Sequence, residues 1–198
     1  LLVLNNGSSS LKFAVFAVDK KLSKQVLAGS FDNVGQKSVL TYKLGFKKFK
    51  INYQSSYNLS AWWGHLLQIL AKFDISYVGL RMVHGGEEFT DTVRVDKNFL
   101  LKIKKYKSLA PLHNPFTLEL IALLKLTWPR VKMAVSFDTA WHKNMPEAAY
   151  LYSLPIKYYQ NYAIRKYGFH GLSHEAATIY AAKVLGKKPA ELKLITCH

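Results

Sequence analysis

The chain has 198 residues, of which 49% are hydrophobic and 14% aromatic. This length and composition allow a buried core and exclude intrinsic disorder. Its 28 Lys and Arg residues against 12 Asp and Glu residues give a formal net charge of +16. Such an excess indicates anionic ligands: phosphate esters, nucleic acid or an acidic membrane surface. The lysines are scattered in short pairs along the chain, however, and scattered lysines are more typical of a solvated surface.

The cysteine content and the terminal residues restrict the class of protein further. The single cysteine, Cys197, excludes an internal disulfide and favours a reducing, cytoplasmic compartment. No apolar run approaches the ~20 residues of a membrane span, and residues 1–4 are too short for a signal peptide. The sequence begins without Met inside an apolar run and ends at His198, so we expect a fragment of a longer protein.

The first elements predict a β-hairpin with a polar turn. Residues 1–4 and 11–18 form apolar runs, and the residues between them are Asn, Gly and Ser, which are typical of turns. The turn offers backbone N–H groups, amides and hydroxyls to a phosphate, with Lys12 just beyond. An ordinary polar hairpin turn is the alternative interpretation.

Several elements are predicted between this hairpin and residue 77. A strand is expected at 25–31 and a second hairpin at 39–53, around Gly45. A helix is expected at 59–73, with Asn58 or Ser60 as its N-cap. We interpret Trp62, Trp63 and His65 in this helix as packing residues.

The stretch from Tyr77 to Thr90 contains an arginine inside an apolar, strand-like run. A guanidinium in a buried strand is unfavourable unless an anion pairs with it. Arg81 is well shaped to bind a carboxylate or phosphate with two hydrogen bonds. Gly85 and Gly86 allow a tight turn at the end of this strand, where α/β sheets place their ligands. An ion pair between Arg81 and a structural acid is the alternative.

The middle of the chain predicts a basic amphipathic helix at 96–106, which we interpret as a surface helix rather than a membrane or nucleic-acid contact. Pro115 fits the first turn of a helix at 116–126. His113 lies between two prolines in the preceding loop. It is interpreted either as a residue that lines a pocket or as a structural hydrogen-bond donor.

A buried strand at 131–137 ends in Asp138. This residue is either a catalytic or metal-binding carboxylate or a cap of the following turn.

In the last third of the sequence, the tyrosine-rich residues 150–167 indicate that the chain passes from the first domain into a second one. His170 and His174 stand four residues apart, but Gly171 separates them and no third ligand is evident, so we do not expect a zinc site. We favour His170 as a ligand of a phosphate, with Ser173 as a possible helix cap. A helix is expected at 175–185 and a final strand at 192–197.

Six motifs in this order resemble the acetate kinase family, which belongs to the acetate and sugar kinase/Hsp70/actin superfamily. The motifs are LNNGSSSLKF, RMVHGGEEFT, LAPLHNP, SFDTAWH-x-x-MP, RKYGFHGLSH and LITCH. The resemblance implies an α/β, RNase H-like (actin-like ATPase) fold: a mixed sheet flanked by helices in residues 1–142, and the start of a second, similar, nucleotide-side domain in residues 143–198. It also implies reversible, in-line phosphorylation of acetate to acetyl phosphate by ATP, with Mg2+, in a protein that is a homodimer at full length.

The resemblance also implies roles for individual residues. Asn5 would lie at the magnesium and phosphate end, and Lys12 would contact ATP. Arg81 would hold the substrate carboxylate. The remaining implied residues are Val83 and Leu112 around the methyl group, His113 nearby, Asp138 as active-site carboxylate, His170 at the transferring phosphoryl group, and His198 at a second phosphate loop.

Two alternatives to acetate phosphorylation remain. Propionate kinases have nearly the same motifs, and Val83 favours acetate because the propionate enzymes tend to have a smaller residue there. A basic module that binds anions or nucleic acid is the alternative from another class. The family's later Gly-rich loop, second arginine, adenosine pocket and magnesium-binding Glu are not in this sequence. We therefore expect the chain alone to be inactive, with no nucleic-acid or membrane partner.

Overall fold

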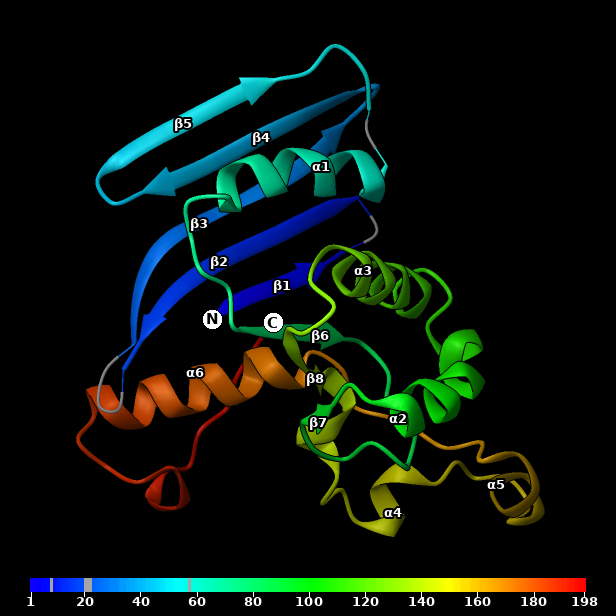
Figure 1. The fold of residues 1–198 in the computed structure, drawn as a ribbon. Helices are drawn as coiled ribbons and strands as arrows, with labels where there is room; N and C mark the ends of the chain where they lie inside the picture. The colour runs from blue at the N-terminus through cyan, green and yellow to red at the C-terminus, as the bar shows by residue number, and fades with distance from the viewer. Residues whose placement is uncertain (8, 20–22, 57) are drawn as a thin grey trace. The chain divides into compact units, whose positions relative to one another are not determined.

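A computed structural model describes residues 1–7, 9–19, 23–56 and 58–198 (Figure 1). Its strands form an eight-stranded sheet in the order β5-β4-β3-β2-β1-β6-β8-β7. The strands are β1 (Leu2–Asn6), β2 (Ser10–Val18), β3 (Ser23–Val34), β4 (Lys37–Leu44), β5 (Lys47–Asn52), β6 (Tyr77–Met82), β7 (Val93–Arg94) and β8 (Lys132–Phe137). The helices are α1 (Leu59–Leu70), α2 (Lys97–Lys102), α3 (Asn114–Thr127), α4 (Glu147–Tyr150), α5 (Lys157–Tyr162) and α6 (Gly171–Val184), with 3-10 helices η1 (Ile103–Leu109), η2 (Asp138–His142) and η3 (Pro189–Glu191).

The chain divides into two compact units. Unit 1 consists of Leu1–Met82 and Val93–Val135, and unit 2 of Val83–Thr92 and Ser136–His198. The predicted domain boundary between residues 142 and 143 stays a prediction. Within the described part of the chain, no helix is both long and apolar enough to cross a membrane.

The sheet of unit 1 is mixed. β1 pairs antiparallel with β2 and parallel with β6, and β4 pairs antiparallel with β5 around Gly45. Both predicted hairpins are confirmed, although Ser8 in the first turn lies outside the described residues. Gly45 has φ of +59°, a conformation that glycine adopts readily.

The core of unit 1 lies between the sheet and α1 (Figure 1). Phe31 of β3 packs against Phe13 of β2 and against Trp62 of α1, with ring centroids 5.9 and 6.0 Å apart. The side chain of Asn58 accepts a hydrogen bond from the Ala61 N–H, which confirms one of the two predicted caps. Trp63 is buried and donates to Thr127 Oγ1 at the end of α3, so the packing role predicted for the tryptophans is confirmed.

The predicted helix at 96–106 is only partly correct. Asp96 caps α2, which ends at Lys102, and the chain continues as the 3-10 helix η1. Pro111 disfavours a helical conformation of the residue before it, and Ala110 has φ of −142° and ψ of 70°. The last turns before Ala110 therefore wind more tightly, as helix ends often do.

Two predictions for the last third were wrong. Residues 192–198 form no strand, because a strand requires a hydrogen-bonded neighbour and the described sheet contains none for this segment. Helix α6 begins at Gly171 rather than at residue 175, so Ser173 lies inside the helix and is not its cap. His170 is the N-cap residue, with φ of +55°.

Close backbone approaches in unit 2 depend on glycines. A Cβ atom on Gly171 would lie 2.0 Å from the Asp138 carbonyl oxygen, and one on Gly168 would lie 2.1 Å from the His142 ring. The start of α6 and the loop before it therefore lie directly against η2. This contact brings His170 to the segment that carries Asp138.

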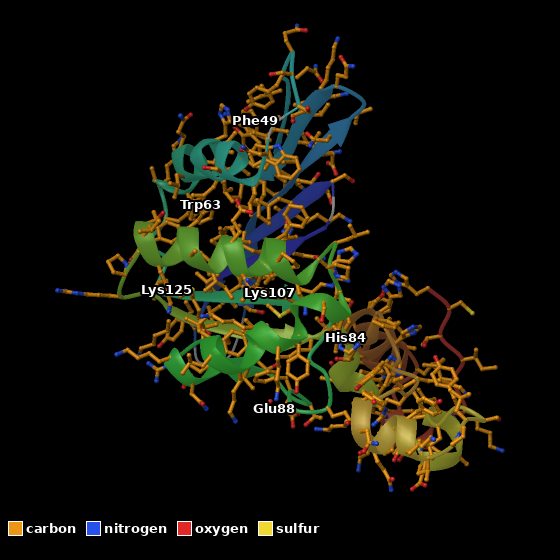
Figure 2. The ribbon with its side chains drawn as sticks, turned by 90° about the vertical axis from the view of Figure 1, so that its right-hand side faces the viewer. Phe49, Trp63, His84, Glu88, Lys107 and Lys125 are labelled. Carbon is orange, nitrogen blue, oxygen red and sulfur yellow. The ribbon has the colours of Figure 1, made fainter. Side chains whose placement is uncertain are left out.

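His84 is buried in unit 2, with 3% of its surface exposed. Its Nδ1 accepts a hydrogen bond from the Gly86 N–H, and its ring contacts the rings of Tyr167 and Phe169 at 4.5 and 5.6 Å. Figure 2 labels this residue. Burial disfavours the charged imidazolium and lowers the pKa of His84 below its usual 6.5.

The two glycines in α6 and α1 should respond oppositely to alanine. Gly171→Ala should lower the free energy of unfolding by about 2 kcal/mol or more, because its Cβ would overlap a backbone oxygen. Gly64→Ala in α1 is the matched control, since nothing lies within 4 Å of its Cβ position. That change should stabilise the protein by ~0.5–1 kcal/mol. Urea unfolding of the two variants measures both values, and equal shifts would contradict the close approach.

Acidification should destabilise unit 2 through His84. Folding lowers the pKa of His84 below 6.5, the usual value that applies in the unfolded chain. The buried neutral ring therefore contributes its full stability above pH 6.5. That contribution is lost as the pH falls from 6.5 toward the lower pKa of the folded state. The free energy of unfolding, measured by urea titration between about pH 8 and pH 5, should therefore fall more steeply in the parent protein than in His84→Gln. Parallel pH profiles would show that His84 does not carry the effect.

Candidate functional site

Three of the predicted site residues lie together in unit 1. Asn5 of β1 pairs directly with Lys12 of β2, so both side chains point to the same face of the sheet. Arg81 Nη1 donates a hydrogen bond of 3.0 Å to Asn5 Oδ1. Leu80 and Met82, on either side of Arg81, are buried, so strand alternation places Arg81 on the face opposite the core.

The contact between Arg81 and Asn5 fixes the orientation of the guanidinium. The partner in this contact is an amide oxygen, which accepts the hydrogen bond and carries no charge. The backbone of Arg81 is also fixed, because Thr117 Oγ1 of α3 donates to its carbonyl oxygen. A half-buried guanidinium held in this way is suited to binding a carboxylate or a phosphate.

Two further predicted residues stand at the start of α3 in unit 1. His113 directly precedes the helix, and its Nδ1 atom is buried without a hydrogen-bond partner among the described residues. Leu112 is 66% exposed. An unsatisfied buried ring nitrogen is unfavourable, so His113 is a candidate for contact with a ligand or with water.

The predicted carboxylate Asp138 belongs to unit 2. It follows β8 directly, opens η2, and is 1% exposed. Its neighbour Thr139 accepts a hydrogen bond from the Gly85 N–H through Oγ1, which ties the Gly-Gly turn to η2. Val83, predicted to line the methyl pocket, is half-buried and begins the segment Val83–Thr92 of unit 2, which contains the Gly-Gly turn. A carboxylate buried at a strand end is the arrangement expected for a catalytic or metal-binding acid.

The structure brings His170 and His198 together within unit 2. Their rings stack with centroids 4.2 Å apart and planes at 17°. A hydrogen bond of 3.0 Å between His198 Nδ1 and Ser173 Oγ, and one of 2.7 Å between His174 Nδ1 and Thr196 Oγ1, hold the last residues against α6. The two predicted histidines, far apart in the sequence, therefore form one imidazole pair.

The described residues contain no group of three or more His, Cys, Asp or Glu side chains that could hold a metal ion. His142, which carried no signal in the sequence, lies beside His174 with ring centroids 6.1 Å apart. Its Nε2 forms a hydrogen bond with the Phe169 carbonyl oxygen, so it helps to position the loop that leads to His170.

Sequence reasoning missed an ionic cluster that supports the same loop. Arg165 Nη1 lies 2.7 Å from Glu87 Oε1, and the Tyr159 hydroxyl donates to the same oxygen. The Arg165 guanidinium also stacks 3.7 Å from the Tyr150 ring centre. Hydrogen bonds with Tyr150 and with Glu87 raise the pKa of Tyr159 to about 12. Glu87 and Arg165 both occur inside quoted motifs, so their opposite charges were the available signal.

Each unit thus holds one set of groups suited to anions. Unit 1 presents a guanidinium, an amide and an ammonium in one row. Unit 2 presents a buried carboxylate and a stacked pair of imidazoles. Cations and amides bind phosphate and carboxylate oxygens, and a carboxylate can share a cation with them. The arrangement fits the transfer or binding of charged phosphoryl or acyl groups.

Comparison with known proteins gives consistent relatives. An acetate kinase from Coprothermobacter proteolyticus is 41% identical, and the match covers 100% of this chain and 52% of the relative. One from Clostridium novyi is 40% identical over 100% of this chain and 51% of its own. This chain therefore spans about half the length of these relatives.

Solved structures agree with the sequence relatives. A propionate kinase from Francisella tularensis superposes with a TM-score of 0.82 at 34% identity, covering 94% of this chain and 49% of its own. Porphyromonas gingivalis acetate kinase gives 0.79 at 32% identity, covering 95% and 49%. The predicted α/β fold with a mixed sheet flanked by helices is confirmed. The Acetokinase family matches residues 1–198, and the chain belongs to this family.

Proposed function

We propose that this chain carries the acyl-binding part of an acetate kinase, which transfers the γ-phosphoryl group of ATP to acetate and forms acetyl phosphate and ADP, reversibly. The proposal rests on family membership across the whole chain and on one structural observation. That observation is the row of Arg81, Asn5 and Lys12 on a single face of the sheet.

The chemical difficulty in this reaction is electrostatic. Acetate is already a nucleophile at neutral pH, so little base catalysis is needed. Two unit charges 4 Å apart repel by about 4 kcal/mol near a protein surface, and acetate must approach a phosphate that carries more than one charge. Catalysis therefore depends on in-line positioning and on cationic groups that are already in place.

The proposed roles follow this requirement. Arg81 holds the acetate carboxylate, and Val83 and Leu112 contact its methyl group. Lys12 binds ATP phosphate oxygens, and His198 lies at the second phosphate loop. His170 stabilises the negative charge on the transferring phosphoryl group, and His113 is a further substrate-binding residue.

Asn5 is the proposed residue at the magnesium end, and Asp138 is the proposed active-site carboxylate. Mg2+ usually keeps several waters and binds one or two carboxylates together with substrate phosphates. A carboxylate buried at a strand end, as Asp138 is, fits that mode. When bound, the ion would neutralise charge on the phosphates. The chain's own contribution is to hold Asp138 rigidly against α6.

We further propose that the complete protein is a cytoplasmic homodimer that acts on acetate and ATP, and that it has no nucleic-acid or membrane partner in this activity. The single exposed cysteine fits a reducing compartment.

Activity should require the second half of the enzyme. The 198-residue chain alone should form no acetyl hydroxamate from acetate, ATP and hydroxylamine. A fusion to the C-terminal half of the Coprothermobacter proteolyticus relative should form it. In that fusion, Arg81→Ala should lower kcat/KM by about 10²–10³, the loss typical of removing a charge-stabilising group. Arg81→Lys should recover only part, because an ammonium cannot make the bidentate contact.

Lys125→Gln is the matched control for these variants, because it removes one exposed positive charge from α3 (Figure 2). It should leave kcat/KM unchanged. Robust activity of the chain alone, free of host enzyme, would overturn the need for the second half. A folded fusion that binds ATP but transfers no phosphoryl group would overturn the proposed function.

Propionate is the second candidate substrate, because the Francisella tularensis propionate kinase superposes well on this chain. One methylene changes binding by only ~1–3 kcal/mol, so pocket size decides the preference. We expect the fusion to favour acetate in kcat/KM, and Val83→Ala to shift the ratio toward propionate by about tenfold. An unchanged ratio in Val83→Ala would remove Val83 from the methyl pocket.

A further inference from the structure

A second basic feature lies on unit 1, along strands β2 to β5. A groove of about 680 Å³ is lined by Lys12, Ser30, Thr41, Lys43, Lys48 and Lys50, among others. Three of these lysines, Lys43, Lys48 and Lys50, belong to the hairpin β4–β5 and have no role in the proposed phosphoryl transfer.

Strand register places the four lysines on one face. Lys12, Ser30, Thr41 and Lys50 are directly paired across the four strands, and so are Ala14, Ala28, Lys43 and Lys48 two positions away. Directly paired residues share a face, and so do residues two apart on one strand. On this face the groove is lined by the small side chains of Ala28, Ser30 and Thr41, with the long lysines around them.

The opposite face of these strands holds the aromatic residues. Phe13, Gly29, Tyr42 and Phe49 are paired in the row between the two lysine rows, and Phe13 belongs to the core beneath α1. Figure 2 shows Phe49 on the side of the sheet that carries α1. Phe13, Tyr42 and Phe49 also belong to the lining of the groove, but the register places their side chains on the opposite face. The two lysine rows, all of whose residues are described, therefore present no aromatic side chain for a nucleic-acid base to stack on.

The groove brings like charges into neighbouring positions. Lys43 lies directly opposite Lys48, and like charges in directly paired positions are destabilising. The acidic group on this face is Asp32, one row beyond Lys12, and its Oδ2 accepts a hydrogen bond of 2.6 Å from Ser30 Oγ. Four lysines against one carboxylate leave an excess of positive charge that an anion would relieve.

The spacing of the lysines indicates the shape of that anion. Lys12 on β2 and Lys50 on β5 are three strand spacings apart, roughly 14 Å at 4.7–4.9 Å per strand. A single phosphate cannot contact lysines at both ends, whereas a linear chain of phosphates can. We propose that this groove binds a linear polyanion of phosphate groups, with inorganic polyphosphate as the matching ligand.

The test is a titration of the 198-residue chain with long-chain inorganic polyphosphate over a series of salt concentrations. The groove variant Lys43→Gln/Lys48→Gln/Lys50→Gln should bind at least tenfold more weakly. The slope of log affinity against log salt should fall by about three, because each of the three lysines neutralises one phosphate in the parent protein. Lys12 is left unchanged because it belongs to the proposed ATP site. Circular dichroism and thermal unfolding verify that the variant is folded.

The control variant Lys104→Gln/Lys107→Gln/Lys125→Gln removes the same charge from exposed positions on η1 and α3 (Figure 2). It should keep both the affinity and most of the salt slope. Equal losses in the two variants, or no polyphosphate binding by the parent protein at low salt, would overturn the proposal. Binding of orthophosphate as tight as that of polyphosphate would contradict the linear ligand. If single-stranded poly-U bound more tightly than polyphosphate, and with the same loss in the groove variant, the groove would be a nucleic-acid site instead.

Discussion

The hydrogen bond between Arg81 Nη1 and Asn5 Oδ1 joins two neighbouring parallel strands, β1 and β6, on the face of the sheet opposite the core. Leu80 and Met82, on either side of Arg81 in β6, are buried in the core. Because side chains alternate along a strand, the guanidinium of Arg81 lies on the opposite face. The amide of Asn5 accepts a hydrogen bond from the guanidinium and fixes its orientation. The unit 1 part of the site therefore depends on strand alternation and on this contact.

The corresponding constraint in unit 2 is a steric one. The start of α6 approaches η2 so closely that a methyl group at Gly171 has no room. This approach sets the backbone of His170 beside the segment of Asp138, and the stacked ring of His198 completes the arrangement. The Glu87–Arg165 pair and the buried ring of His84 support the same loop from another side. Packing and hydrogen bonds thus hold these imidazoles in place.

Much of the fold could be predicted from the sequence because its signals are local. The hairpin around Gly45 and the cap at Asn58 follow from turn and cap preferences. The strand expected at 192–197 and the helix start expected at 175 were wrong, because pairing and close packing depend on neighbours that local patterns do not reveal. For the site, motif order indicated Arg81, Asp138 and His170, and their roles remain proposals. The contact between Arg81 and Asn5 required strand register, and the roles of His84 and His142 required the tertiary structure.

His170 enters α6 with a left-handed backbone, φ +55° and ψ +23°. Residues other than glycine adopt this region at a cost of roughly 1–2 kcal/mol, and a glycine at this position would avoid that cost. Glycine at this position would stabilise the fold but would also remove the imidazole. If His170 has the role proposed above, selection for thermal stability and selection for turnover therefore favour different residues at this position.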